Sequence, residues 1–446
     1  MTARTGGNVL MVYALHQHPV RATITDHLEA FQRYSPGRVF PLNLQVQKIP
    51  SWLDRVDFDL VVFHTTFLSC RWAPELFARL AEAARPLRAL STTFVALPQD
   101  EFLHADILSA FIEDFGIDWV FTVAPESEIP TIYRDVDRDR VRFHRVLTGY
   151  LERETLRRID RIVAETRDRP IDVGYRAWQG APWLGRHGTL KGGLAAAVND
   201  AAPRTGLTVD VSTDEADTLL GDDWYRFLAR CRATIGIEGG ASILDHDGSL
   251  KAATERYLAE HPGAGFDEVE ASCFPGRDGE LRLFALSPRH LEACATRTAQ
   301  LLVRGEYNGI LEPGRHYVEL EPDLSNLDAA LERVRTGDGL DDMIEASYRD
   351  VVASGRFTYE SFVAEVEITA LDGRRPVRAP SRELDRLHRR ALAAERASKV
   401  SIRLRIALGP IAARARESVL IAGTRVLPRP ARRLLSRLAV RVRGAG

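Results

Sequence analysis

Short apolar segments of strand length alternate with helical patterns through most of this chain. In the first half the apolar segments are VLMVYAL, RVFPLNL, LVVFHTT, ALSTTFVAL and WVFTVA, and helical patterns begin near Thr23, Pro74 and Ala105. This alternation predicts a doubly wound parallel sheet, because parallel strands need a crossover between them that is usually a helix. Ligands of such sheets bind beyond the carboxyl ends of the strands, so the residues after each apolar segment are candidates for a site.

The same alternation starts again near Ile171. The charged helical segment LERETLRRIDRIVAETRDRP precedes it and ends at Pro170, which is typical of a connector between domains. The later strand-like segments are IDVGYR, LTVDVS, ATIGIE, AQLLV and HYVELE. A chain of 446 residues with 45% hydrophobic content can bury two cores. We therefore predict an α/β protein with two Rossmann-like doubly wound domains facing a cleft, at residues 1–165 and 166–370, and a tail at 371–446.

The tail differs sharply in charge from the rest of the chain. Residues 381–446 contain seventeen Lys or Arg against four Asp or Glu, a net charge of +13, whereas the whole chain carries −2. Arginines alternate with apolar residues, and prolines at 410, 428 and 430 predict a division into short amphipathic helices. Such helices suit an anionic membrane surface, and the alternative is a helical appendage on the acidic body. The tail lacks aromatic residues that would stack on bases, so no nucleic-acid partner is expected.

Cysteine usage and the N-terminal sequence indicate a cytoplasmic protein. The four cysteines are scattered without CxxC spacing, which argues against a disulfide framework or a zinc cluster. The first residues run directly into the segment VLMVYAL without a secretory signal, and no apolar run of membrane-spanning length occurs. We expect a cytoplasmic location, peripheral at the inner face of the cell membrane if the tail binds lipid.

The segment from Ala285 to Asn326 is the strongest candidate for a ligand site. Ser287 can cap a helix with Pro288 at its first turn, and the N–H groups at such a helix start, which includes Arg289, attract a diphosphate. Glu292, one turn deeper, can accept hydrogen bonds from ribose hydroxyls. The AQLLV strand brings Tyr307 to the same crevice. The alternative is an ordinary capped helix packed on a sheet.

Two further segments follow strands of the second half. A glycine-rich stretch places Arg176 after the strand at 171–176 and Lys191 at the start of a helix, where cations and backbone N–H groups can hold a diphosphate. Arg186 competes with Arg176 for this role, and a flexible surface loop is the alternative. Glu238 precedes a Gly-Gly pair and is a candidate for contact with the sugar or base. The nearby triplet at 245–247 has the pattern DxD, which we discount as a metal site, so we expect no metal and no cofactor.

Candidates for acid or base chemistry lie in the first half. Asp100 and Glu101 follow the strand TTFVAL and can take a proton from an acceptor hydroxyl. His16 and His18 follow VLMVYAL, and Asp26 and His27 begin the next helix, so an imidazole is a competing base. Capping or solvent-facing roles are the alternatives for each of these side chains.

Several segments together resemble one family of proteins. They are TITDHLEAFQRYS, FVALPQDEF, VLTGY, IDVGYRAWQGAPWLGRHGTLK, IGIEGGASILDHDG and the stretch after Ala285, in collinear order over roughly residues 8 to 330. They are similar to glycosyltransferases of the two-Rossmann GT-B architecture, in the branch that resembles spore-maturation-type and polysaccharide-cluster enzymes. The resemblance implies an N-terminal acceptor domain and a C-terminal domain that binds a nucleotide-sugar. Arg176, and Lys191 with Gly192, match the family's diphosphate-binding pattern.

One departure from the family bears on mechanism. Many retaining relatives carry a second Glu about seven residues before the ribose-binding Glu, whereas RLFALSPRH has no acidic residue and Phe284 occupies that region. The stereochemical outcome therefore stays open. The resemblance implies a metal-independent hexosyltransferase-like enzyme that moves a sugar to a hydroxyl of a glycan or lipid-linked acceptor, in cell-surface polysaccharide synthesis. The alternatives are a catalytically inactive nucleotide- or sugar-binding scaffold at the membrane surface and a nucleotide-sugar epimerase.

Overall fold

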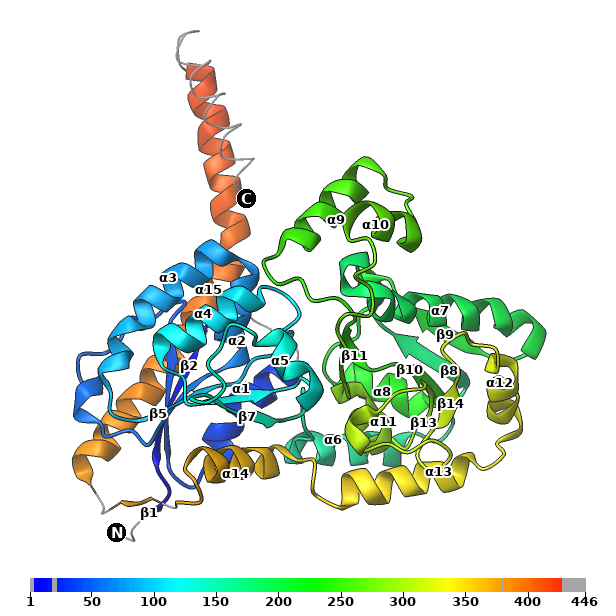
Figure 1. The fold of residues 1–446 in the computed structure, drawn as a ribbon, viewed down its shortest axis with the longest axis horizontal. Helices are drawn as coiled ribbons and strands as arrows, with labels where there is room; N and C mark the ends of the chain where they lie inside the picture. The colour runs from blue at the N-terminus through cyan, green and yellow to red at the C-terminus, as the bar shows by residue number, and fades with distance from the viewer. Residues whose placement is uncertain (1–3, 18–21, 375, 379–380, 427–446) are drawn as a thin grey trace.

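The computed structural model describes residues 4–17, 22–374, 376–378 and 381–426 of the chain. Its N-terminal domain is built on a six-stranded parallel sheet in the order β3-β2-β4-β5-β6-β7 (Figure 1). The strands are β2 (Asn8–Tyr13), β3 (Arg38–Asn43), β4 (Leu60–Phe63), β5 (Thr93–Ala96), β6 (Trp119–Thr122) and β7 (Arg142–Arg145). The helices between them are α1 (Ala22–Tyr34), α2 (Thr65–Leu68), α3 (Pro74–Ala84), α4 (Ala105–Phe115) and α5 (Ile129–Ile132), and α6 (Arg153–Glu165) leads to the second domain.

The C-terminal domain contains a five-stranded parallel sheet in the order β14-β13-β10-β8-β9. Its strands are β8 (Ile171–Arg176), β9 (Val209–Ser212), β10 (Cys231–Gly236), β13 (Ala299–Val303) and β14 (Val318–Leu320). Its helices are α7 (Gly185–Thr205), α8 (Asp222–Arg230), α9 (Ser249–Glu260), α10 (Phe266–Cys273), α11 (Pro288–Ala295), α12 (Leu327–Thr336) and α13 (Leu340–Ser347). A small antiparallel pair, β11 (Gly239–Ala241) and β12 (Leu283–Ala285), lies outside this sheet. Helix α7 begins at Gly185, earlier than the predicted start at Lys191.

Both sheets reverse their strand order at the same topological position. The first strand of each domain lies between the second and the third, so the order reverses between β2 and β4 in one sheet and between β8 and β10 in the other. A crevice opens at such a switch point, beyond the carboxyl ends of the strands. The predicted fold class, α/β with two Rossmann-like doubly wound domains, is confirmed.

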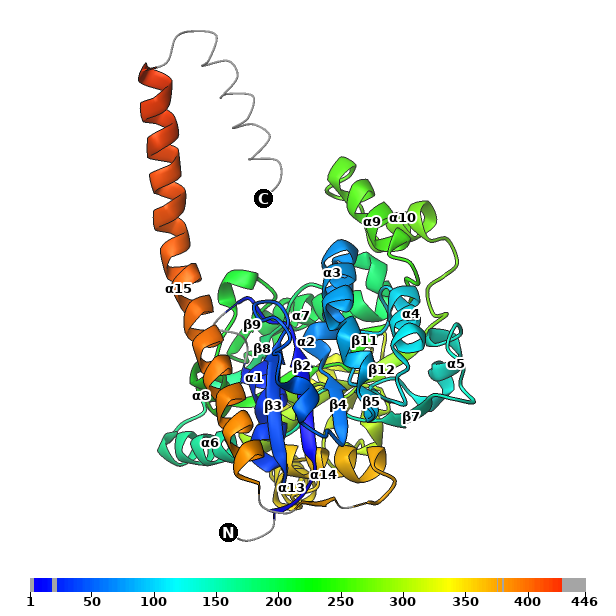
Figure 2. The same cartoon turned by 90° about the vertical axis from the view of Figure 1, so that its left-hand side faces the viewer.

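The end of the chain packs on the N-terminal domain. Helix α14 (Tyr359–Ala370) packs against α1, and its Phe362 is fully buried in the core of the first sheet. Helix α15 (Arg382–Val426) then runs along β3 and buries Leu387 in that core (Figure 2). Arg38 forms an ion pair with Asp385 at 2.8 Å. Residues on both sides of the predicted boundary at 370 thus belong to the core of the N-terminal domain.

Helix α15 is longer than predicted and is not interrupted. It is a single helix through Pro410, so the expected break at this residue is wrong. A proline removes one backbone hydrogen bond, but its fixed φ is compatible with a helix. Pro428 and Pro430 lie outside the described residues. Beyond the segment that packs on β3, the helix projects away from the body and exposes Val400 and Leu404 (Figures 1 and 2).

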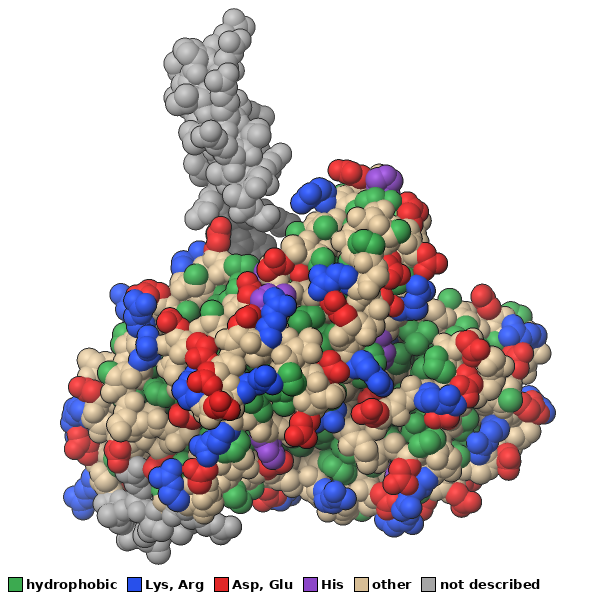
Figure 3. Space-filling view, viewed as in Figure 1, with side chains coloured by type: hydrophobic (Ala, Val, Ile, Leu, Met, Phe, Trp, Pro, Cys, Tyr) green, Lys and Arg blue, Asp and Glu red, His purple; other side chains and the backbone are tan. Residues whose placement is uncertain are grey.

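The outer surface mixes both signs of charge. Acidic and basic side chains are interspersed over both domains on the face shown in Figure 3. Many of them form exposed ion pairs, such as Arg142 with Asp372 at 2.7 Å and Arg315 with Asp350 at 2.7 Å. Among the helices within the described ranges, none has the length and apolar character that crossing a bilayer requires.

Candidate active site

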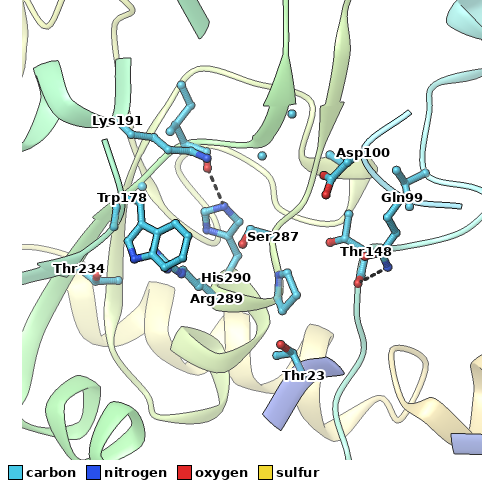
Figure 4. A pocket seen from close by; sticks show the side chains of 18 of the residues that line it. Thr23, Gln99, Asp100, Thr148, Trp178, Lys191, Thr234, Ser287, Arg289 and His290 are labelled. Carbon is cyan, nitrogen blue, oxygen red and sulfur yellow. Dashed lines mark hydrogen bonds between the residues drawn. The ribbon is translucent and has the colours of Figure 1, made fainter. Parts of the chain in front are cut away.

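A pocket lies between the two domains, at the carboxyl ends of their strands. One side, the N-terminal wall, is formed by Thr23, His27, Thr65, Gln99, Asp100 and Thr148. The opposite side, the C-terminal wall, includes Trp178, Lys191, Thr234, Gly239, Gly240, Ser287, Arg289 and His290. Figure 4 shows Asp100 and Lys191 on opposite sides of this space.

A second pocket adjoins the first and extends it along the C-terminal domain. Both are lined by Thr23, Trp178, Trp224, Ser287 and Arg289. The second pocket adds Arg176, Tyr225, Glu292 and residues 219–221. The two pockets therefore form one cleft, which runs from Asp100 to Glu292.

The start of α11 lies where the two domains touch. Ser287 has an extended backbone and Pro288 occupies the first turn, as predicted, but the Ser287 hydroxyl caps no N–H group of the helix; the residue lines both pockets. Thr148 of the N-terminal domain donates a hydrogen bond to the carbonyl of Leu286 at 2.7 Å. Gly149 packs so closely that a Cβ there would lie 2.7 Å from Pro288 Cγ. Glycine at 149 thus permits the contact that positions the helix start.

Two cations of the C-terminal wall face the first pocket. Lys191 lies on α7, and desolvation together with the charge of Arg289 lowers the pKa of its amine, although Asp100 opposes this shift. The guanidinium of Arg289 donates a hydrogen bond to the carbonyl of Arg176 and lies over the ring of Trp224, 5.6 Å from its centroid. Two positive charges that destabilise each other favour an anionic ligand between them.

Asp100 projects into the pocket from a strained loop. Its backbone is left-handed, with φ of 53°, a conformation that costs energy outside glycine and asparagine. The buried guanidinium of Arg71 holds this loop by donating to the carbonyls of Asp100 at 2.5 Å and Gln99 at 3.0 Å. Solvent reaches the Asp100 side chain through the pocket, but the surrounding protein desolvates it and raises the pKa of its carboxyl, with Arg71 and Lys191 acting in the opposite direction.

Glu101, the neighbour of Asp100, points the other way. Its carboxylate is fully buried in the N-terminal domain and accepts hydrogen bonds from the Thr122 hydroxyl at 2.5 Å, the Val123 N–H at 3.2 Å and the Tyr133 hydroxyl at 3.3 Å. Burial raises the pKa of this carboxyl. Glu101 lines neither pocket and anchors the loop that carries Asp100.

Glu292 and Arg176 lie at the second pocket. The carboxylate of Glu292 accepts a hydrogen bond from Trp224 Nε1 at 2.8 Å, and burial raises its pKa. Arg176 is held by Asp210, whose carboxylate is 2.7 Å away, and its guanidinium lies 4.4 Å from the ring centroid of Phe227. Arg176 therefore lines the second pocket, whereas its predicted partner Lys191 lines the first.

Three other candidates from the sequence lie away from the cleft. The carboxylate of Glu238 accepts hydrogen bonds from the Tyr307 N–H at 2.8 Å and the Glu306 N–H at 3.2 Å. It therefore stabilises the loop after β13. Tyr307 is fully buried, and its hydroxyl donates to the carbonyl of Val303 at 2.5 Å. His16 is exposed at the end of a strand and lines neither pocket. His18 lies outside the described residues.

The remaining polar candidates have structural partners. Asp245 accepts hydrogen bonds from the N–H groups of Leu250 and Lys251, and Asp247 accepts one from Ser249, so the DxD carboxylates cap α9. Arg186 pairs with Asp267 at 2.7 Å and lines neither pocket. Within the described part of the chain, no cluster of three or more His, Cys, Asp or Glu side chains is arranged to hold a metal ion.

The cleft also contains residues that the sequence reasoning did not single out. Gln99 and Thr148 follow β5 and β7, and Trp178 follows β8 by two residues, so the strand-end rule could have found them. Trp224 carries no such signal, because it lies in the first turn of α8 and reaches the cleft only through the packing of that helix.

Comparisons with known proteins give distant likenesses in structure. No protein-family model matches the sequence, and no curated protein matches it. Among solved structures, Anabaena HepE in complex with UDP and glucose is 13% identical, with a TM-score of 0.44 over 81% of this chain and 99% of that one. A glycosyltransferase from Rickettsia africae is 10% identical, with a TM-score of 0.42 over 82% and 99%. Sucrose-phosphate synthase from Thermosynechococcus elongatus is 11% identical, with a TM-score of 0.42 over 87% and 99%. All these TM-scores are below 0.5, so the cleft is interpreted from its own geometry.

Proposed function

We propose that this protein is a glycosyltransferase that moves a sugar from a nucleotide-sugar donor to a hydroxyl of a glycan or lipid-linked acceptor. The observation that carries the proposal is the division of charge across one interdomain cleft. Lys191 and Arg289 face the cleft from one side, and the carboxylate of Asp100 faces it from the other. A diphosphate leaving group needs positive charge, whereas an attacking hydroxyl needs a proton acceptor.

The nucleotide-sugar would lie along the C-terminal wall. Its diphosphate would contact Lys191, Arg289 and the first turn of α11, where the helix dipole favours negative charge. Glu292 lies one turn deeper in the adjoining pocket and would accept hydrogen bonds from the ribose hydroxyls. In this proposal the two cations neutralise the departing diphosphate without a metal ion.

The acceptor would enter along the N-terminal wall. The bond between the anomeric carbon and the diphosphate oxygen breaks, a bond from that carbon to the acceptor oxygen forms, and the acceptor proton passes to Asp100. The products are a glycoside and a nucleoside diphosphate. Desolvation raises the pKa of Asp100, which makes its carboxylate a better proton acceptor than an ordinary aspartate. We place this reaction in cell-surface polysaccharide synthesis, on the basis of the sequence resemblance.

A binding screen tests the proposal. The purified protein is titrated with UDP, GDP, CDP and dTDP and with their common sugar conjugates, and any ligand that binds is tested again on Glu292→Ala and Arg289→Ala variants. We expect one diphosphate to bind in the micromolar range and to bind at least tenfold more weakly to each variant. Arg186→Ala is the matched control, because this arginine is exposed outside both pockets. If none of the nucleotides binds, the proposal fails.

We also propose that the projecting part of α15 contacts an anionic membrane surface. Residues 407–446 contain nine arginines and one glutamate, and Val400 and Leu404 are exposed where the helix leaves the body. Ending the chain after Ile406 removes the basic segment and retains the part that packs on β3. Loss of cosedimentation with phosphatidylserine vesicles, but not of nucleotide binding, is the expected result. Retained cosedimentation would show that the segment is not the anchor.

A further inference from the structure

Two buried histidines form a chain of hydrogen bonds that ends at the pocket. His27 on α1 lines the N-terminal wall, and its Nδ1 lies 2.8 Å from Nε2 of His64. His64 is fully buried directly before α2. The aromatic rings of Tyr359 and Phe362 also pack on the His27 ring, at centroid distances of 5.8 and 5.0 Å.

The position of each proton follows from one backbone group. The N–H of Thr66 donates to His64 Nδ1 at 3.1 Å, so that this nitrogen must be an acceptor. The Thr66 hydroxyl lies 3.0 Å from the same nitrogen and can also donate to it. A neutral His64 then carries its proton on Nε2 and donates it to His27 Nδ1. His27 in turn carries its own proton on Nε2, because Nδ1 is occupied as an acceptor. A single amide thus sets both tautomers.

We infer that His27 presents a fixed Nε2–H donor to an acceptor hydroxyl in the cleft, and that it positions the acceptor sugar rather than deprotonating it. Within the described residues, Nε2 has no hydrogen-bond partner in the protein, while the ring lines the pocket. One hydroxyl of an acceptor on this wall would accept a hydrogen bond from His27, while Asp100 on the same wall takes the proton of the hydroxyl that reacts. The identity of this ligand rests on the proposed function; the two tautomers do not.

The hydrogen bonds of the two histidines also oppose the change of tautomer that His27 would need in order to act as a base. For Nε2 of His27 to accept a proton, both rings would have to exchange tautomers, and His64 Nδ1 would then direct a proton at the Thr66 N–H. The buried N–H would lose its partner, which is costly. Desolvation acts in the same direction, since it lowers the pKa of His27 to about 4 and that of His64 well below its usual value.

The tautomers can be measured without any ligand. Side-chain 15N spectra of protein labelled at histidine are recorded from pH 5.5 to 9, with His27→Gln and His64→Asn variants to assign the two signals. We expect both rings to remain neutral with the proton on Nε2 over the whole range. Titration of either ring near pH 6.5, or a proton on Nδ1 of His27, would overturn the inference.

Kinetics with the full chain test the positioning role. His27→Ala is expected to raise the KM for the acceptor about tenfold, the size of one lost hydrogen bond, and to leave donor KM and the pH profile unchanged. His27→Gln retains an N–H donor at the place of Nε2 and should recover most of the loss. Arg186→Ala is the matched control, because this arginine lies outside both pockets; it should behave as wild type.

The possible failures can be told apart. If His27→Ala lowers kcat and removes a limb of the pH profile, His27 is a base and the inference is wrong. If wild-type protein binds no nucleotide and transfers no sugar, the acceptor role fails together with the proposed function. In that case the measured tautomers would still decide whether His27 is a fixed neutral donor.

Discussion

The two walls of the cleft have the same origin in the fold but opposite chemistry. Each is made largely of segments that follow parallel strands near a switch point. Both walls present hydroxyls and an imidazole, but the charged group of the N-terminal wall is a carboxylate, whereas the C-terminal wall presents two cations and a helix start. Equivalent topology therefore provides equivalent positions, and the residues at the strand ends decide what each position binds.

The walls also differ in how their charged groups are held. Lys191 lies within the regular helix α7, so its placement needs no special support. Asp100 has a left-handed backbone and depends on the buried Arg71 and on the anchor of Glu101. The N-terminal wall is thus the side on which backbone strain is stored and compensated.

Asp100→Asn should produce the largest effect on the reaction. Removing the proton acceptor is expected to lower kcat by about 10² to 10⁴-fold, the usual contribution of a general base, with nucleotide affinity unchanged. Steady-state kinetics and calorimetry measure the two quantities. An unchanged kcat would show that the carboxylate of the N-terminal wall has no part in the chemistry.

The pH dependence provides a control for this variant. The pKa of Asp100 is raised by desolvation, so wild-type kcat should fall with decreasing pH at a value above that of an ordinary aspartate, and this limb should vanish in the variant. Because the folded state disfavours the ionised carboxyl, Asp100→Asn should melt no lower than wild type. A lower melting temperature would indicate structural damage instead.

Lys191→Met should affect the C-terminal wall selectively. Loss of one charge-assisted hydrogen bond is expected to weaken binding of the nucleoside diphosphate about 10 to 100-fold, while binding of the nucleoside alone stays the same. Isothermal titration with both ligands measures the difference. Equal weakening of both would mean that Lys191 does not contact the phosphates.

Glu292→Gln should have a smaller effect, limited to the ribose. The amide can still face Trp224 but is a weaker acceptor, so we expect affinity for the nucleotide to fall about 3 to 10-fold. The corresponding 2′-deoxynucleotide should show little further loss in the variant. If the variant discriminates against the deoxynucleotide as strongly as wild type does, Glu292 does not contact the 2′-hydroxyl.

Glu101→Ala should change turnover least, although it alters the residue next to Asp100. It leaves the Thr122 and Tyr133 hydroxyls and the Val123 N–H without their common acceptor, so we expect a loss of about 2 to 3 kcal/mol in stability. Turnover at low temperature should stay within about fivefold of wild type, because removing one anchor costs positioning rather than the reacting group. Differential scanning calorimetry and kinetics together separate the two roles of these adjacent carboxylates.

Sequence reasoning predicted the strands well because their apolar segments are local signals. It also selected Lys191, Ser287, Arg289 and Glu292, which line the cleft. It could not tell Asp100 from Glu101, because the choice depends on a left-handed residue and on Arg71, nearly thirty positions earlier. Glu238 and Tyr307 were selected for the same strand-end position, but Glu238 accepts a hydrogen bond from the Tyr307 N–H and the Tyr307 hydroxyl donates to Val303, so both are buried. Side-chain direction at a loop is set by distant contacts.

The return of α14 and α15 to the first sheet affects the order in which the protein can be made. Phe362 and Leu387 complete a core whose strands begin at Asn8, so the N-terminal domain is finished only after the whole second domain has been synthesised. During synthesis, part of the apolar surface of the first sheet stays exposed until the more than two hundred residues between this sheet and α14 have been added. The domain that is translated first is therefore the last to complete its core. Shortened chains that end before α14 should expose this apolar surface, aggregate and be degraded.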